Sequence, residues 1–123
     1  IKNWFFLDMS MPFFIKYSFL STNNSLNSFG PGNLAVRFSD FEPIEYALSF
    51  KKSVGWVWVD TFKKFPLSTS AFHKLKNSHF KICLVSPELH GHPFTYISEM
   101  RSMIDNQGVI VDAVCTKFPE AWS

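Results

Sequence analysis

The run Val54-Gly55-Trp56-Val57-Trp58-Val59, followed at once by Asp60-Thr61, decides how this 123-residue chain folds. Most of its residues are β-branched or aromatic, types that favour β-strands. The run is apolar at every position rather than at alternate positions, which is typical of a strand buried on both faces of a parallel sheet. The sequence therefore predicts a buried parallel strand over residues 54–59 that ends in a polar turn.

Outward from this run, four similar apolar runs recur at regular intervals and also end near acid, hydroxyl or basic residues. These further expected strands cover residues 4–9, 33–38, 80–85 and 111–116. Helices are expected between the strands, because Pro residues, a capping Ser-Thr-Ser and a closing Gly punctuate the intervening segments. Their signals are Pro12, Pro43, Ser68-Thr69-Ser70 and, for a long helix over residues 94–106, Gly108.

The resulting order of alternating strands and helices predicts an α/β fold: a parallel sheet of about five strands with alternating helices. Two arrangements fit this order, an open doubly wound sheet and the C-terminal half of a TIM-type (β/α)8 barrel, which needs about 250 residues when whole. We favour the half barrel, so residues 1–123 are interpreted as a single partial barrel domain. The chain begins with Ile1 rather than Met, as expected of a fragment of a longer protein.

The charge, the hydrophobic runs and the cysteines of the chain limit the kinds of partner and setting that it fits. The net charge is +2 and the bases are scattered, which argues against nucleic-acid binding. No run reaches the roughly 18 apolar residues of a transmembrane helix. Cys83 and Cys115 lie in apolar runs without metal-binding spacing, which favours free thiols in a reducing, cytoplasmic setting over a cross-strand disulfide.

Charged residues stand where the expected strands end: Asp8, Arg37, Asp60, Glu88 and Lys117. Parallel strands align their carboxyl ends at one edge, where α/β proteins gather functional groups. These acids and bases suit a polyol or phosphorylated ligand, because Arg binds phosphate bidentately and carboxylates accept hydrogen bonds from hydroxyls. The alternative is a set of salt bridges that ties the strand ends together.

Two further motifs lie near this edge. Trp58 is two residues before Asp60 and points to the same side of the sheet, either as a stacking floor for a sugar or as part of the core. The His90-Gly91-His92 motif is either part of a zinc site or belongs to a flexible surface loop. Ser86 is a candidate nucleophile only if one of these histidines reaches it as a general base.

The C-terminal part carries a resemblance to a known superfamily. It reads Lys81-Ile82-Cys83-Leu84-Val85-Ser86, then a helix, then Gly108-Val109-Ile110-Val111-Asp112-Ala113-Val114-Cys115-Thr116-Lys117-Phe118-Pro119-Glu120. This resembles the closing β-α-β unit of phosphatidylinositol-phospholipase-C-like phosphodiesterases, which include the glycerophosphodiester phosphodiesterases. Thr116 and Pro119 keep the pattern of that unit, whereas Lys117 stands where Asp is usual. The motif covers about residues 80–122, and the strand rhythm covers the whole chain.

The resemblance implies a barrel that cleaves phosphodiesters by general acid–base chemistry, often with a divalent metal such as Mg²⁺ or Ca²⁺. The catalytic histidines of the superfamily lie on early strands that this sequence lacks, so no catalytic residue is carried over. Arg37 and Asp60 occupy strand ends comparable to those that hold inositol hydroxyls in such enzymes. Asp8 and Glu88 are the candidate metal ligands, and Lys117 departs from a metal-binding last strand.

We therefore expect the C-terminal part of a phosphodiesterase-like barrel that binds or cleaves a glycerophospho- or inositol-phosphodiester or a polyol. Arg37 and Lys117 are expected to bind phosphate or polyol, and Asp60 and Glu88 to orient hydroxyls. This part alone is expected to lack activity, and a missing N-terminal half or a homodimer would complete the barrel. The alternatives are a non-catalytic barrel that binds a sugar or lipid headgroup, and a metal-dependent hydrolase built on Glu88 and the histidine motif.

Overall fold

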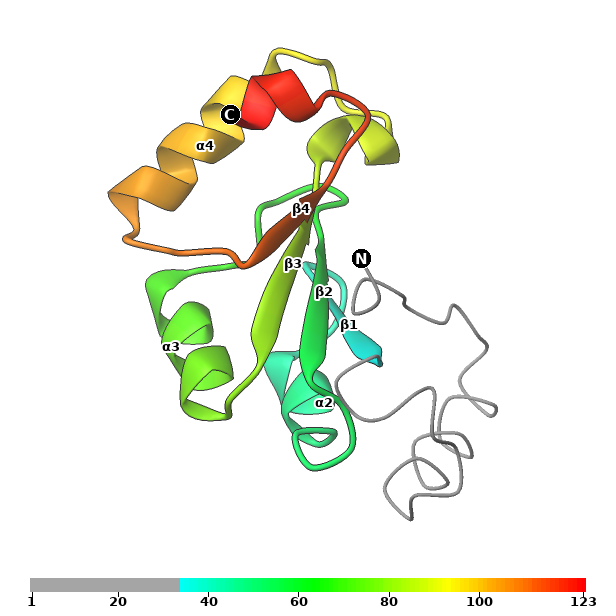
Figure 1. Ribbon diagram of the computed structural model, residues 1–123, viewed down its shortest axis with the longest axis vertical. Helices are drawn as coiled ribbons and strands as arrows, with labels where there is room; N and C mark the ends of the chain where they lie inside the picture. Colours follow the sequence, from blue (N-terminus) through cyan, green and yellow to red (C-terminus); the bar gives the residue numbers. More distant parts are fainter. Residues whose placement is uncertain (1–33) are drawn as a thin grey trace.

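A computed structural model describes residues 34–123, and within this range the chain forms a four-stranded parallel sheet with alternating helices (Figure 1). The strands are β1 (Ala35–Ser39), β2 (Trp56–Asp60), β3 (Lys81–Val85) and β4 (Ala113–Cys115). Their order in the sheet follows their order in the chain. The prediction of a parallel α/β sheet is confirmed, and the expected strand over residues 4–9 lies outside the described residues.

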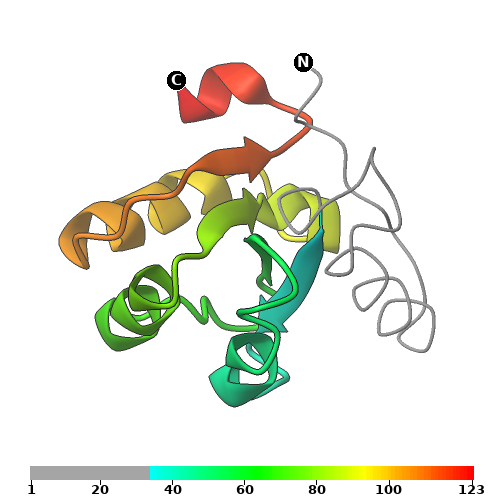
Figure 2. The ribbon, with the colours of Figure 1, turned by 60° about the horizontal axis from the view of Figure 1, so that its bottom comes forward.

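The helices connect successive strands, except for the last one, which follows β4. They are α2 (Ile44–Leu48), α3 (Thr69–Asn77), the 3-10 helix η2 (Pro87–His90), α4 (Tyr96–Asn106) and the terminal 3-10 helix η3 (Pro119–Trp122). Figure 2 shows α2, α3 and α4 along one side of the sheet. This follows from the sequential strand order, because right-handed crossovers that all advance in one direction place their helices on one face. None of the helices within residues 34–123 has the length and apolar character needed to cross a membrane.

The two faces of the sheet differ in chemistry because successive side chains of a strand point to opposite sides. The helix-covered face carries the aliphatic and aromatic residues of the core, Val36, Phe38, Val57, Val59, Ile82 and Leu84. The opposite face carries the alternate positions, Arg37, Ser39, Trp58, Asp60 and Cys83. Polar and charged side chains of the strands are thereby directed away from the core.

The local boundaries follow the expected signals with two differences. The long helix begins at Tyr96 rather than Phe94, because residues 93–96 form a turn in which the Tyr96 N–H donates to the Pro93 carbonyl at 2.9 Å. Gly108 follows the helix with a φ of 64°, a left-handed conformation that favours glycine. β4 is shorter than expected, because the Asp112 carboxylate accepts the Ile82 N–H at 2.8 Å just before the ladder begins.

The cap of α3 provides a test of the local structure. The Ser68 hydroxyl accepts a hydrogen bond from the Ala71 N–H at 3.1 Å, as expected of an N-cap. Ser68→Ala should lower the free energy of unfolding by about 1 kcal/mol in urea titrations. Ser70→Ala, an exposed substitution inside the same helix, should leave it within about 0.5 kcal/mol. Equal losses in both variants would contradict the capping role.

Candidate functional site

The carboxyl ends of the four strands meet at one edge of the sheet, as the parallel pairing requires. Ser39 at the end of β1 is in register with Asp60 at the end of β2. The segments that follow the strands, including η2 after β3 and the turn after β4, leave from this edge. Arg37 and Asp60 lie on the neighbouring strands β1 and β2, and Glu88 and Lys117 lie in the segments that follow β3 and β4. All four therefore belong to the carboxyl edge, as expected from the sequence.

The central feature of this edge is an ion pair between Asp60 and His90. The distance between Asp60 Oδ1 and His90 Nε2 is 2.7 Å. The Asp60 side chain is 6% exposed and the His90 side chain 23%. A buried carboxylate thus holds an imidazole that remains in contact with solvent. The sequence predicted the position of Asp60 but not this partner, because the two residues are 30 positions apart and only the η2 turn brings them together.

Burial raises the pKa of Asp60 above its ordinary value, and the hydrogen bond from His90 and the positive charge of Arg37 oppose this shift without cancelling it. Because the folded state holds the proton more tightly than the unfolded state, the stability of the protein falls as the pH rises through this raised pKa. Ionisation of Asp60 therefore lowers the free energy of unfolding. A buried carboxylate with a raised pKa next to a histidine is a common feature of functional sites.

The ring of Phe62, in the segment after β2, lies between several side chains of the site. The Phe62 and His90 rings are 4.6 Å apart between centroids, and the Arg37 Cζ lies 5.6 Å from the Phe62 centroid. Phe41 stacks on Phe62 at 5.0 Å with an angle of 6° between the ring planes. Arg37 and His90 therefore both contact the ring of Phe62.

Asp40 fixes the segment that carries Phe62. Its carboxylate accepts the backbone N–H groups of Phe62, Lys63 and Lys64 at 2.9, 2.9 and 3.0 Å. Burial alone would raise the pKa of Asp40, but the three backbone donors outweigh it and leave the pKa below its ordinary value. Asp40 is therefore a structural carboxylate that links the loops after β1 and β2.

Within residues 34–123, Arg37 forms side-chain hydrogen bonds through one of its three nitrogens. Its Nε donates to Glu42 Oε1 at 2.9 Å, and Ser39 Oγ donates to the other Glu42 oxygen at 2.5 Å. The two terminal guanidinium nitrogens make no hydrogen bond with another residue of the described range. Because the Arg37 side chain is 55% exposed, these nitrogens remain available to a ligand oxygen.

Both carboxylate oxygens of Glu88 accept hydrogen bonds from within the protein. One carboxylate oxygen accepts the Thr116 hydroxyl at 2.6 Å and the Lys117 N–H at 3.0 Å, and the other accepts the Ser86 hydroxyl. Burial opposes ionisation of Glu88, but these three donors outweigh it and lower its pKa. Glu88 thus links the end of β3 to the end of β4. This agrees with the alternative interpretation, in which polar residues at the edge join the strand ends to one another.

Ser86 is likewise a structural group. Its hydroxyl donates to Glu88 and accepts the indole N–H of Trp122 at 2.9 Å. Within the described residues its hydroxyl makes no hydrogen bond to a histidine, so a nucleophile activated in that way is not supported. The side chain of Lys117 is exposed at the same end of β4 and takes part in no ion pair within residues 34–123.

Trp58 lies at the middle of the polar face of the sheet. It is in register with Arg37 on one side and with Cys83 on the other, and it is partly buried. It therefore shares a face with Asp60, as the spacing predicted. Cys83 is buried and Cys115 partly buried, and both are free thiols, as expected from the sequence.

The histidine motif forms neither a free loop nor a zinc site. His92 Nε2 lies 3.1 Å from the Thr61 carbonyl oxygen, and its ring stacks on Tyr96 at 4.8 Å, so the two histidines have separate partners. No three His, Cys, Asp or Glu side chains of the described range come close enough together to hold a metal ion. Neither zinc nor the implied Mg²⁺ or Ca²⁺ fits these residues, and Asp8, the other candidate ligand, lies outside the described residues.

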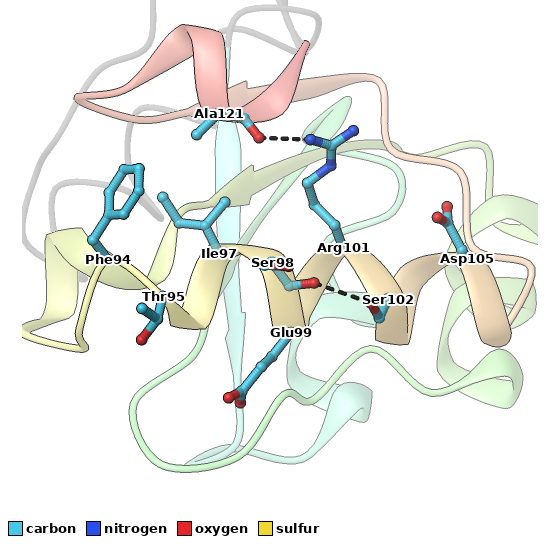
Figure 3. Close-up of a pocket in the computed structure, with 9 residues that line it drawn as sticks. All are labelled: Phe94, Thr95, Ile97, Ser98, Glu99, Arg101, Ser102, Asp105 and Ala121. Carbon is cyan, nitrogen blue, oxygen red and sulfur yellow. Dashed lines mark hydrogen bonds between the residues drawn. The ribbon is translucent and has the colours of Figure 1, made fainter.

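An open hollow of about 720 Å³ lies on the outer side of α4 (Figure 3). Arg101 crosses it, and its guanidinium donates to the Ala121 carbonyl at 2.7 Å and to a Ser123 oxygen at 3.2 Å. The hollow is thus the seam along which η3 attaches to α4. Its main polar side chain is occupied in holding the end of the described chain, so the carboxyl edge is the better candidate site.

Comparisons of the chain with protein-family models, with curated proteins and with solved structures found no match. The function is therefore inferred from the geometry of the carboxyl edge.

The role of Glu88 is open to a direct test. Glu88→Ala should lower the free energy of unfolding at pH 7 by roughly 1–3 kcal/mol, because it leaves the donors of Ser86, Thr116 and Lys117 without their acceptor. Glu88→Gln keeps an acceptor oxygen and should cost less.

The pH dependence separates charge from hydrogen bonding. Because the folded pKa of Glu88 is lowered, its carboxylate stabilises the fold above the unfolded pKa, and this contribution is lost as the pH falls through the folded pKa. The difference in unfolding free energy between wild type and Glu88→Gln should therefore shrink on acidification. A difference that is constant from neutral to acidic pH would contradict a stabilising carboxylate.

Proposed function

We propose that this chain forms the C-terminal half of a phosphodiesterase-like (β/α)8 barrel whose carboxyl edge binds a phosphodiester and takes part in its hydrolysis. The sequential parallel strands with helices on one side agree with consecutive units of such a barrel. The Asp60–His90 pair is the single observation that carries the chemistry, because a buried carboxylate that orients a partly exposed imidazole is suited to proton transfer.

His90 is the proposed general base. With the Nε2–H donated to an ionised Asp60, the lone pair of Nδ1 is left to accept a proton. In hydrolysis the hydroxyl of water forms a bond to phosphorus, the bond from phosphorus to the leaving oxygen breaks, and the water loses one proton while that oxygen gains one. Nδ1 of His90 accepts a proton from the attacking water, the leaving oxygen on the opposite side of phosphorus takes a proton from solvent, and His90 afterwards releases its proton to solvent. Asp60 stabilises the imidazolium that exists until His90 releases this proton.

Arg37 is the proposed phosphate ligand. Its terminal nitrogens are available, Glu42 holds its Nε, and Phe62 places it on the same aromatic ring as His90. A guanidinium in this position neutralises the charge that develops on the phosphoryl oxygens. Lys117 adds a second positive charge at the end of β4. No step is assigned to a metal ion, because the described residues provide no ligand set for one.

A second candidate is a barrel half that binds a polyol phosphate without cleaving it. It is favoured by the internal hydrogen bonds of Glu88, which occupy both oxygens of a carboxylate that we expected to orient ligand hydroxyls or hold a metal. In this case Arg37 and Asp60 bind the ligand, and His90 supplies a hydrogen bond rather than a route for a proton.

Activity of the intact protein distinguishes the two candidates. Glycerophospho- or inositol-phosphodiesters should be hydrolysed without an added divalent metal ion, and His90→Gln should lower kcat by about 10²–10⁴-fold because the proton acceptor is lost. Asp60→Asn should lower kcat and change the pH profile, because the imidazole loses its charged partner. His73→Gln, an exposed histidine on α3, serves as the control and should leave kcat unchanged. Wild-type kcat in the His90→Gln variant would rule out the acid–base role.

Ligand binding is tested separately from turnover. Arg37→Ala should weaken the binding of glycerol phosphate or inositol phosphate, measured by calorimetry, by roughly 10–100-fold, because charge-assisted hydrogen bonds of about 1.5–3 kcal/mol are lost. Lys52→Ala, in the loop before β2 at the opposite edge of the sheet, should leave binding unchanged. Binding that Arg37→Ala weakens, together with no turnover of any diester by the wild type, would support the non-catalytic candidate.

A further inference from the structure

We propose that the amino edge of the sheet, at the opposite end of the strands from the candidate site, binds an acidic polypeptide segment of a partner protein. None of the residues of the carboxyl edge takes part, so this surface goes beyond the proposed function. The surface is built from five side chains that we call the amino-edge lysines: Lys51, Lys52, Lys74, Lys76 and Lys81.

The fold brings the amino-edge lysines together from two separate parts of the sequence. Helices α2 and α3 run back against the strands, so both end at the side of the sheet where the strands begin (Figures 1 and 2). The first two lysines follow α2 in the loop before β2, the next two lie in the last turn of α3, and the fifth opens β3. The starts of β2 and β3 are adjacent, because the Lys81 N–H donates to the Gly55 carbonyl at 2.9 Å.

Most of the positive charge of this edge is left without an internal partner. Asp112, just before β4, accepts hydrogen bonds from Lys76 Nζ at 2.5 Å and from the Ile82 N–H at 2.8 Å, so this acid is already occupied. The other four amino-edge lysines are exposed and take part in no ion pair within residues 34–123. A cluster of uncompensated charges of one sign attracts a partner of the opposite sign.

The aromatic rings of the amino edge argue against a single-stranded nucleic acid as this partner. Such nucleic acids bind largely by stacking their bases on accessible aromatic side chains. Trp56 is only 6% exposed and Phe80 only 2%, and Lys81 Nζ lies 5.5 Å from the centre of the Trp56 ring. The cations are also lysines rather than arginines, which would hold phosphate groups bidentately.

An acidic peptide matches this edge in its hydrogen-bonding groups as well as in its charge. Helices α2 and α3 direct the carbonyl groups of their last turns toward the edge, beside the ammonium groups of the lysines. The carboxylates of an acidic peptide accept hydrogen bonds from the ammonium groups, and its backbone N–H groups donate to carbonyl oxygens. The phosphates of a nucleic acid offer acceptors only, so a peptide complements this mixture better.

The conformation of His79 provides a second observation at this edge. The residue follows α3 and has a φ of 66°, a left-handed conformation in which glycine is the usual residue. The Phe80 N–H donates to the Leu75 carbonyl at 3.2 Å, as is typical of a helix that ends in this way. His79 is exposed, so its side chain does not offset the backbone strain by packing into the core. Strain kept at an exposed position points to a role of the side chain in binding.

Binding of fluorescently labelled poly-L-glutamate to the purified protein, followed by fluorescence anisotropy, tests this inference. The wild type should bind, and its affinity should fall as salt is added, because exposed charges are screened. Lys51→Ala with Lys52→Ala should weaken binding roughly 2–25-fold, the combined effect of two exposed ion pairs.

The matched control is Lys63→Ala with Lys64→Ala, two exposed neighbouring lysines at the carboxyl edge. This variant should bind poly-L-glutamate like the wild type, and circular dichroism should show that all variants fold. An equal loss in both double variants, or no binding at low salt, would overturn the amino-edge surface. Tighter binding to duplex DNA than to poly-L-glutamate, lost in the Lys51 and Lys52 variant, would overturn it in favour of a nucleic acid.

His79→Gly tests the contribution of the strained residue. The variant should unfold at a higher urea concentration than the wild type, because glycine adopts the left-handed conformation without strain. It should also bind poly-L-glutamate roughly twofold or more weakly, because the hydrogen-bonding imidazole is lost. A gain in stability with unchanged binding would overturn the assignment of His79 to the surface.

The result is separable from that of the proposed function. Lys51→Ala with Lys52→Ala should leave the turnover of a diester unchanged, because both lysines lie at the far end of the strands from Asp60 and His90. Turnover of a diester by a protein that does not bind poly-L-glutamate would refute the amino-edge surface alone. Binding of poly-L-glutamate by a protein that cleaves no diester would support the surface and refute the hydrolysis.

Discussion

The register of the parallel ladder is the constraint on which the candidate site depends. β1 and β2 pair so that Ser39 lies opposite Asp60, and alternate residues then face the helices or the opposite side. Val57 and Val59 fill the core, while Trp58 and Asp60 face away from it. A shift of one residue would turn Asp60 into the apolar layer and bring valine to the site. The hydrophobic pattern of β2 thus determines where its carboxylate lies.

Carboxylates at this edge divide into two kinds according to their hydrogen bonds. Asp40 and Glu88 each accept three donors, their pKa values are lowered, and they join neighbouring loops. Asp60 is more deeply buried and has His90 as its hydrogen-bonding partner, and its pKa is raised. The same chemical group therefore stabilises the scaffold in one setting and costs stability in the other. We interpret the costly carboxylate as the functional one.

Much of the scaffold could be predicted from the sequence, because the strands at residues 56–60 and 81–85 are continuous apolar runs and Ser68 and Gly108 are strong helix signals. The position of Asp60 at a strand end followed from the same pattern. The partnership with His90 could not be predicted, because it depends on the turn that η2 makes after Pro87. A histidine shortly after the neighbouring parallel strand was the available signal.

Cys83 occupies the polar face of the sheet between Trp58 and Ala113, and burial raises its pKa to about 12. At neutral pH almost none of this thiol is in the reactive thiolate form, so alkylating reagents modify it only after the strands around it separate. The rate of its modification therefore reports how often β3 and β4 part in the native protein. This chain therefore carries its own chemical reporter for transient opening of the sheet at the strand that follows Asp60 in the ladder.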